Sequence, residues 1–132
     1  MTRTRPSNAF LVYWLPLLAW LGIMLYFTTA PHPYAPLEGT GWRPGDAPSH
    51  VIGYLIMGLL LMRLACRLHG CSYRTVAWAL LIAVVYATLD ELHQIPIESR
   101  GFAVMDIVCN AAGATIAAGI TVALWRRRSA PH

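Results

Sequence analysis

Long apolar stretches separated by short polar segments run along the whole chain. Four of them have the roughly 17–25 residues that a helix needs to cross about 30 Å of hydrocarbon. They cover approximately residues 10–28, 49–66, 75–95 and 106–125. The pattern predicts an all-α fold: a polytopic membrane protein with a bundle of four transmembrane helices. It places all of residues 1–132 in a single domain.

Composition supports the same class. The 132 residues are 57% hydrophobic and 12% charged, and the mean hydropathy is +0.51. Ordinary soluble domains are less apolar and carry about 25% charged residues. A chain of this length also has no room for a separate soluble catalytic module. We therefore expect an integral membrane protein.

The segments before the second apolar stretch need separate treatment. Residues 30–48 are rich in proline and glycine, which favours an extended surface loop. Arg3 and Arg5 precede the first apolar stretch and Thr28-Thr29-Ala30 resembles a cleavage site, so a cleaved secretory signal is the alternative to a first spanning helix. Signal cores have only about 7–15 residues, and this longer stretch favours a retained helix. Pro16 is expected to kink it, which neighbouring helices accommodate.

Positive charge is concentrated on one predicted side of the membrane. The chain has no lysine, and eight of its ten arginines lie near the termini or around the second connection. They are Arg3, Arg5, Arg63, Arg67, Arg74, Arg126, Arg127 and Arg128; only Arg43 and Arg100 lie elsewhere. The positive-inside rule predicts that both termini are cytoplasmic. The net charge of +4 then reflects topology and contact with membrane lipids, and we expect no nucleic-acid partner.

The acidic residues fall on the opposite, outer side. They are Glu38, Asp46, Asp90, Glu91, Glu98 and Asp106. Ionisable groups within membrane-spanning stretches are costly, and they usually face the protein interior, water or a ligand. The run Asp90-Glu91-Leu92-His93-Gln94 is therefore the first candidate for function.

Polar side chains recur at helical spacing at the outer ends of three stretches. Residues three, four or seven apart share one face of a helix. The sets are His50 with Tyr54, Asp90 and Glu91 with Gln94, and Asp106 with Asn110 and Gly113. His93 points about 100–200° away from the Glu91 and Gln94 face. Arg100 lies in the connection above these residues, so we expect one polar cluster open to the outer surface.

These residues, in this order and spacing, resemble the VanZ-like membrane family. The resemblance covers approximately residues 46–120, while the first apolar stretch is similar only in being a helix. It rests on His50-Val51-Ile52-Gly53-Tyr54, Glu91-Leu92-His93-Gln94, Ile97-Glu98-Ser99-Arg100, and Asp106 with Asn110 and Gly113. Two positions depart from the family pattern. Ala47 stands where a lysine often follows the aspartate, and Glu98-Ser99 precedes Arg100 where Pro-Gly is common.

The resemblance implies a multi-pass protein of the bacterial cytoplasmic membrane and a link to resistance against the glycopeptide teicoplanin. It implies no particular reaction, so whether the chain is an enzyme stays open. We expect it to bind or modify a lipid-linked or amphiphilic molecule of the cell envelope through an outer-leaflet polar site. One alternative is a non-catalytic membrane scaffold or partner subunit whose polar network is structural. A small transporter is another, although four short helices enclose little path without oligomerising.

The candidate residues divide by chemistry. Glu91, His50 and Asp106 are candidate catalytic residues, because carboxylates and imidazoles carry acid–base chemistry. Arg100 is a candidate for gripping a phosphate or carboxylate. The other candidate ligand-binding residues are Gln94, Asn110, Tyr54, Asp90 and His93. Structural alternatives are an interhelical network of Glu91, Gln94 and Arg100, an N-cap at Asp106, and a Tyr54 hydroxyl bonded to a neighbour.

Small residues and potential metal ligands give the remaining predictions from the sequence. We expect a close-packing helix face from Gly113, Ala114, Ala117, Ala118 and Gly119, and a packing role for Cys66, Cys71 and Cys109. Hard and borderline ligands for a divalent metal occur at His50, Asp90, Glu91, His93 and Asp106. Their spacing matches no metal motif, so the sequence predicts no metal site and no particular cofactor. A homo-oligomer is compatible with the chain.

Overall fold

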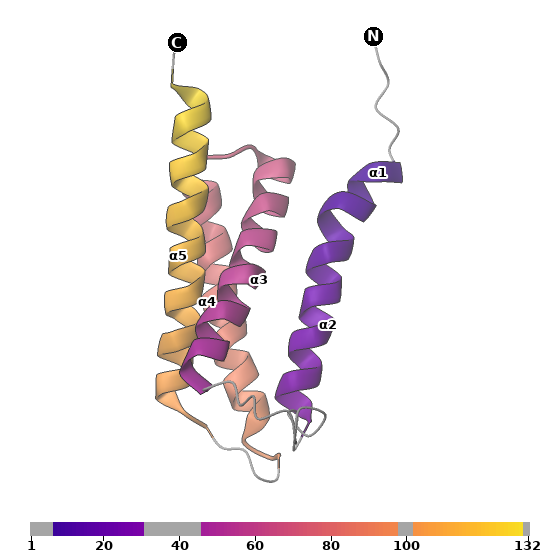
Figure 1. The fold of residues 1–132 in the computed structure, drawn as a ribbon, viewed down its shortest axis with the longest axis vertical. Helices are drawn as coiled ribbons and strands as arrows, with labels where there is room; N and C mark the ends of the chain where they lie inside the picture. The colour runs from indigo at the N-terminus through magenta and orange to yellow at the C-terminus, as the bar shows by residue number, and fades with distance from the viewer. Residues whose placement is uncertain (1–6, 31–45, 98–101, 131–132) are drawn as a thin grey trace.

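The computed structural model describes residues 7–30, 46–97 and 102–130, and it is helical through nearly all of them. The elements are α1 (Ser7–Ala9), a π-helical turn η1 (Phe10–Trp14), α2 (Leu15–Thr29), α3 (Asp46–His69), α4 (Tyr73–Gln94) and α5 (Val104–Ser129). The first three run on as one helix (Figure 1). This helix and α3, α4 and α5 are each long and apolar enough to cross a membrane. The prediction of an all-α protein with four spanning helices is confirmed.

The helices extend beyond the predicted bounds at most ends, and α3 and α5 are each six residues longer than predicted. The start of α3 shows why. Helix α3 begins at Asp46 instead of residue 49, so its first three residues form a helical turn where we predicted the end of an extended loop. Proline is tolerated in a first turn because the amide it lacks has no partner within the helix there, and Pro48 occupies such a position. The rest of the predicted loop, residues 31–45, lies outside the described residues.

The expected perturbation at Pro16 takes the form of a wide turn. The backbone amide of Leu15 donates to the carbonyl of Phe10, five residues earlier, where an α-helix would use the residue four earlier. Pro16 has no amide hydrogen to continue the regular ladder. The N-terminal helix therefore widens over one turn and then resumes as α2.

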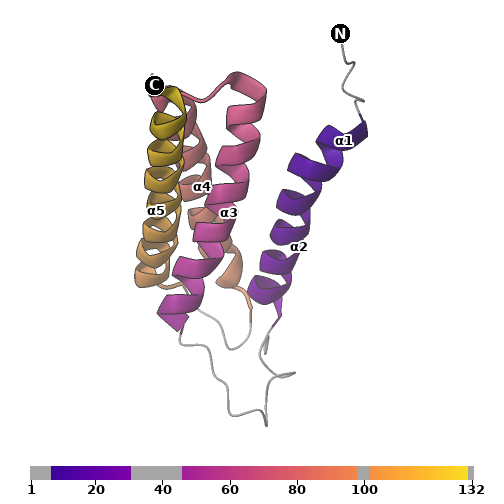
Figure 2. The ribbon, with the colours of Figure 1, turned by 45° about the horizontal axis from the view of Figure 1, so that its top comes forward.

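Helices α3 and α5 pack with their backbones in close approach. A Cβ atom at Gly113 would overlap the Val51 carbonyl oxygen and lie 2.9 Å from the Leu55 nitrogen. One at Gly58 would lie 2.8 Å from the Cβ of Ala117. Small residues let membrane helices approach in this way. Figure 2 shows α5 beside α3, with α4 packed against both and α2 further away.

The predicted small-residue face is correct for four residues and wrong for the fifth. Gly113, Ala114, Ala117 and Ala118 are buried. Gly119 is exposed, and a Cβ there would have nothing within 4 Å. Six residues after Gly113, the helix has turned by about 240° relative to it, so Gly119 faces away from α3.

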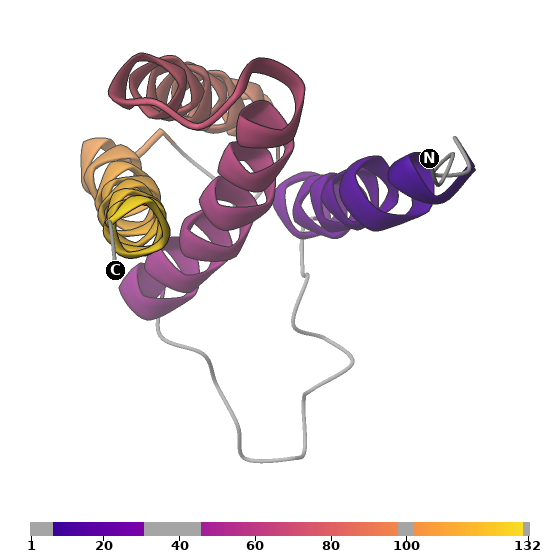
Figure 3. The same ribbon diagram turned by 90° about the horizontal axis from the view of Figure 1, so that it is seen from above.

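Helix α2 is attached to the side of this three-helix core. Viewed along the bundle, α3, α4 and α5 cluster together while α2 stands beside α3 (Figure 3). The indole Nε1 of Trp20 donates to the carbonyl of Gly53 over 3.0 Å, and Leu17 and Met24 are buried in the core. The Trp20 hydrogen bond and these buried apolar side chains hold α2 against α3 and the core.

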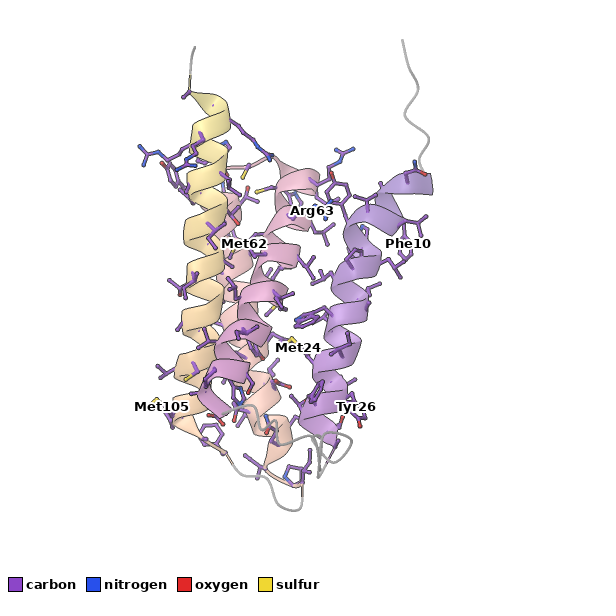
Figure 4. The ribbon with its side chains drawn as sticks, viewed as in Figure 1. Phe10, Met24, Tyr26, Met62, Arg63 and Met105 are labelled. Atoms are coloured by element: carbon purple, nitrogen blue, oxygen red, sulfur yellow. The ribbon has the colours of Figure 1, made fainter. Side chains whose placement is uncertain are left out.

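Charge separates along the bundle axis. Arg63 and Phe10 lie toward one end, and Met105 and Tyr26 toward the other (Figure 4). The guanidinium of Arg63 lies 4.8 Å from the ring centroid of Tyr13. Both ends of the described chain, α1 and the end of α5, lie at the arginine end (Figure 1). The buried acidic residues belong to the other end, where α3 and α5 begin and α4 finishes.

Candidate functional site

Three helix ends bring ionisable side chains together. His50 lies in the second turn of α3, Glu91 in the last turn of α4, and Asp106 in the first turn of α5. One potential ligand atom from each lies within 4.8 Å of the others. We call these three residues the polar cluster. They are far apart in sequence, and only the packing of α3, α4 and α5 brings them to one place.

The imidazole of His50 has a polar neighbour on each side. Its Nδ1 lies 2.9 Å from Asn110 Oδ1, and its Nε2 lies 3.5 Å from Asp106 Oδ2. An amide oxygen only accepts hydrogen bonds, so Nδ1 carries a proton and donates it to Asn110. Nε2 then faces the Asp106 carboxylate. Asn110 is fully buried, which makes it a rigid support for the ring.

Glu91 is the most deeply placed member of the polar cluster. Its side chain is 0% exposed, and its Oε1 accepts a hydrogen bond of 3.2 Å from Gln94 Nε2. Its Oε2 and the Asn110 Nδ2 have no hydrogen-bond partner among the residues that the structure describes. An unsatisfied buried polar group costs about 1–3 kcal/mol. Each of these two atoms can therefore form a further hydrogen bond beside the polar cluster.

Asp90 forms a second, separate pair with Tyr54. The Tyr54 hydroxyl donates to Asp90 Oδ2 over 3.1 Å, and both side chains are buried. The side chain of Thr28, at the end of α2, also interacts with Asp90. Sequence reasoning predicted that the Tyr54 hydroxyl would bond to a neighbour, which is confirmed. It missed Thr28, whose only signal is a hydroxyl near the end of an apolar helix.

The remaining predicted site residues have different outcomes. Gln94 joins the polar cluster through Glu91. His93 is exposed, in agreement with the helical rotation that turned it away from Glu91. Arg100 lies outside the described residues.

The N-cap interpretation of Asp106 is wrong, because α5 begins two residues earlier with Ala103 at its N-cap and no side-chain cap. The Asp106 side chain faces His50.

The chemistry of the polar cluster follows from its composition. One imidazole and two carboxylates offer proton acceptors, proton donors and oxygen and nitrogen ligands for a cation. In the described part of the chain, the arginines belong to the other end of the bundle: Arg63, Arg67, Arg74, Arg126, Arg127 and Arg128. Within those same residues, His50 is thus the basic group in contact with these carboxylates.

Fold and polar cluster together define a multi-pass membrane protein with a partly buried ionisable cluster at one end of its bundle. The chain belongs to the VanZ/LLP1 family, whose model matches residues 13–126. This match confirms the resemblance seen in the motifs and extends it over the first spanning helix. Comparisons with curated proteins and with solved structures gave no match.

Proposed function

We propose that the chain binds or modifies a lipid-linked or amphiphilic molecule of the bacterial cell envelope at the polar cluster. One observation carries the proposal: a fully buried glutamate, Glu91, meets His50 and Asp106 at the end of apolar spanning helices. Charged groups at such depth are expensive and usually functional. An amphiphile can place its polar head at the cluster and its acyl chain along the apolar helix surface.

The candidate roles follow from the geometry. Glu91 and His50 are the groups suited to acid–base chemistry, and the Asp106 carboxylate lies 3.5 Å from the other side of the imidazole. Asn110 and Gln94 support these groups by hydrogen bonds. The link to teicoplanin resistance that the family name carries agrees with an envelope precursor as the bound molecule. Arg100 would recognise a phosphate or carboxylate on that molecule.

A structural role is the second candidate, and the hydrogen bonds within the bundle favour it. Tyr54 binds Asp90 across two helices, and Gln94 binds Glu91 within one. Such networks can simply fix the geometry of helices in a membrane scaffold or partner subunit. The unpaired Oε2 of Glu91 weighs against this reading, because a purely structural network is expected to satisfy its buried members.

We also propose that the polar cluster faces outward and that both termini are cytoplasmic. The support is the separation of described arginines and acidic residues along the bundle, combined with the positive-inside rule. Reporter fusions after Arg128 and within residues 67–74 should therefore report cytoplasm, and a fusion near Gly41 should report the outside. An external C-terminus would reverse the assignment of the cluster to the outer face.

Photo-crosslinking tests the proposed binding locally. Met105 is 66% exposed beside Asp106, and Leu124 is 49% exposed near the other end of the same helix. A benzophenone amino acid at Met105 should form an adduct with a specific envelope amphiphile in cells. The matched probe at Leu124 should capture only bulk phospholipid. Identical adducts at the two positions would argue against a site at the polar cluster.

A further inference from the structure

We infer that His50, Glu91 and Asp106 form a binding site for a divalent transition-metal ion, of which Zn²⁺ and Mn²⁺ are the best-matched examples. Three observations support the site independently of any amphiphile: the distances among the three residues, the orientation of the imidazole, and an unpaired buried carboxylate oxygen. The inference goes beyond the proposed function, because metal binding can occur and be measured whether or not the protein binds an envelope molecule.

The distances allow a single ion after side-chain adjustments of about 1.3 Å. The three potential ligand atoms lie within 4.8 Å of one another. Zinc bonds to nitrogen and carboxylate oxygen are about 2.0–2.2 Å long, so ligand atoms in a tetrahedral site lie about 3.3–3.6 Å apart. Side-chain rotation that brings the widest-spaced atoms about 1.3 Å closer satisfies this geometry. Each residue lies in a helix, so the backbone supports of all three are firm.

The His50 ring is held in the orientation that a metal ligand needs. Nδ1 donates to Asn110 Oδ1 over 2.9 Å, which leaves the lone pair of a neutral ring on Nε2. That nitrogen lies 3.5 Å from Asp106 Oδ2, so a lone pair faces an anionic oxygen. A cation between the two atoms turns this repulsion into attraction. Metal-binding histidines almost always donate their second ring nitrogen to such a supporting group.

Glu91 supplies the second observation that points to a ligand. Its carboxylate is 0% exposed, and its Oε2 has no hydrogen-bond partner among the described residues. Two carboxylates this close together repel each other, most strongly where water is excluded. A divalent cation would neutralise both charges and bond to the unpaired oxygen.

The ligand types select the class of ion. Calcium and magnesium prefer sites made of oxygen ligands alone, whereas an imidazole with two carboxylates suits borderline transition metals. Three protein ligands also leave at least one coordination position open, as in catalytic zinc sites. An anionic headgroup is the kind of group that could occupy such a position.

Metal titration of the untagged protein in detergent tests the inference. The protein is stripped with a chelator, and Zn²⁺ and Mn²⁺ binding is then measured by calorimetry and by metal analysis after gel filtration. We expect one ion per chain for the wild type. Glu91→Gln and Asp106→Asn should each weaken binding at least a hundredfold, and Asn110→Ala about 10–100-fold, the usual effect of losing a supporting group. His69→Gln, an exposed change at the other end of the helix that carries His50, should bind like the wild type.

Two results would overturn the inference. The first is that the wild type binds well below one ion per chain. The second is that Glu91→Gln and Asp106→Asn bind the metal as well as the wild type does. Circular dichroism and gel filtration establish that each variant is folded; if Glu91→Gln is not, Asp106→Asn decides, because its side chain is 26% exposed and tolerates change better. A failed metal test would leave the crosslink at Met105 intact, so the two proposals fail separately.

Discussion

Gly113→Ala is expected to destabilise the protein more than any other single-methyl change in the described helices. The added Cβ would overlap the Val51 carbonyl oxygen and lie 2.9 Å from the Leu55 nitrogen. Both neighbours are backbone atoms of α3, so neither can rotate away as a flexible side chain would. Overpacking typically costs about 1–3 kcal/mol, occasionally more, and we expect a value at or above the top of that range. Thermal melting in detergent measures it.

Gly119→Ala is the matched control on the same helix. Nothing lies within 4 Å of a Cβ at that position, and alanine favours a helix over glycine by about 0.8–1.0 kcal/mol. The control should therefore melt at or slightly above the wild-type temperature. Equal melting temperatures for the two variants would mean that α3 and α5 do not approach as closely as described. The loss at Gly113 should also remove function, because separation of the helices moves His50 away from Asn110 and Asp106.

Glu91→Gln should keep the fold and abolish the activity. Glutamine has nearly the same shape as glutamate, and its Oε1 can still accept the hydrogen bond that Gln94 now donates to Glu91. The change removes the negative charge and the proton acceptor on which binding or acid–base chemistry depends; general acid–base groups typically contribute about 10²–10⁴-fold. We expect a melting temperature close to the wild-type value together with loss of glycopeptide resistance in a host that depends on the chain.

An ion pair would give a different pattern. If Glu91 served only to pair with Arg100, removing either partner would leave a charge unpaired and cost several kcal/mol, about 3–5 for a buried pair. The double variant would then recover much of that loss. A folded and fully active Glu91→Gln protein would remove Glu91 from the site altogether.

The spanning helices could be predicted because their signal is long and local. Runs of about 20 apolar residues are sufficient to identify them. Their ends could not be predicted to the residue, since polar residues outside the hydrocarbon can continue a helix. Helix α3 starts at Asp46, and α5 continues through Arg126, Arg127 and Arg128. The apolar pattern alone predicts neither extension.

Helical spacing predicted most of the polar cluster and could not assign its partners. Asp90 and Glu91 are neighbours in sequence and differ by about 100° around the helix. The packing of the helices places Asp90 in hydrogen-bond contact with Tyr54, and it places Glu91 beside His50 and Asp106. The bond from His50 to Asn110 joins residues 60 positions apart, so it depends on the approach of α3 to α5. Asp106 was ambiguous for the same reason as the helix ends: its role depended on where α5 begins.

Analysis of the molecules that co-purify with the protein is the most direct test of the central claim. Wild type, Glu91→Gln and the control His69→Gln, an exposed change at the far end of α3, would be purified from native membranes under identical conditions. Their bound lipids and cell-wall precursors would then be compared by mass spectrometry. We expect an amphiphile with a defined headgroup on the wild type and on His69→Gln, and its loss from folded Glu91→Gln. The same molecules in equal amounts on all three proteins would contradict a ligand site at the polar cluster.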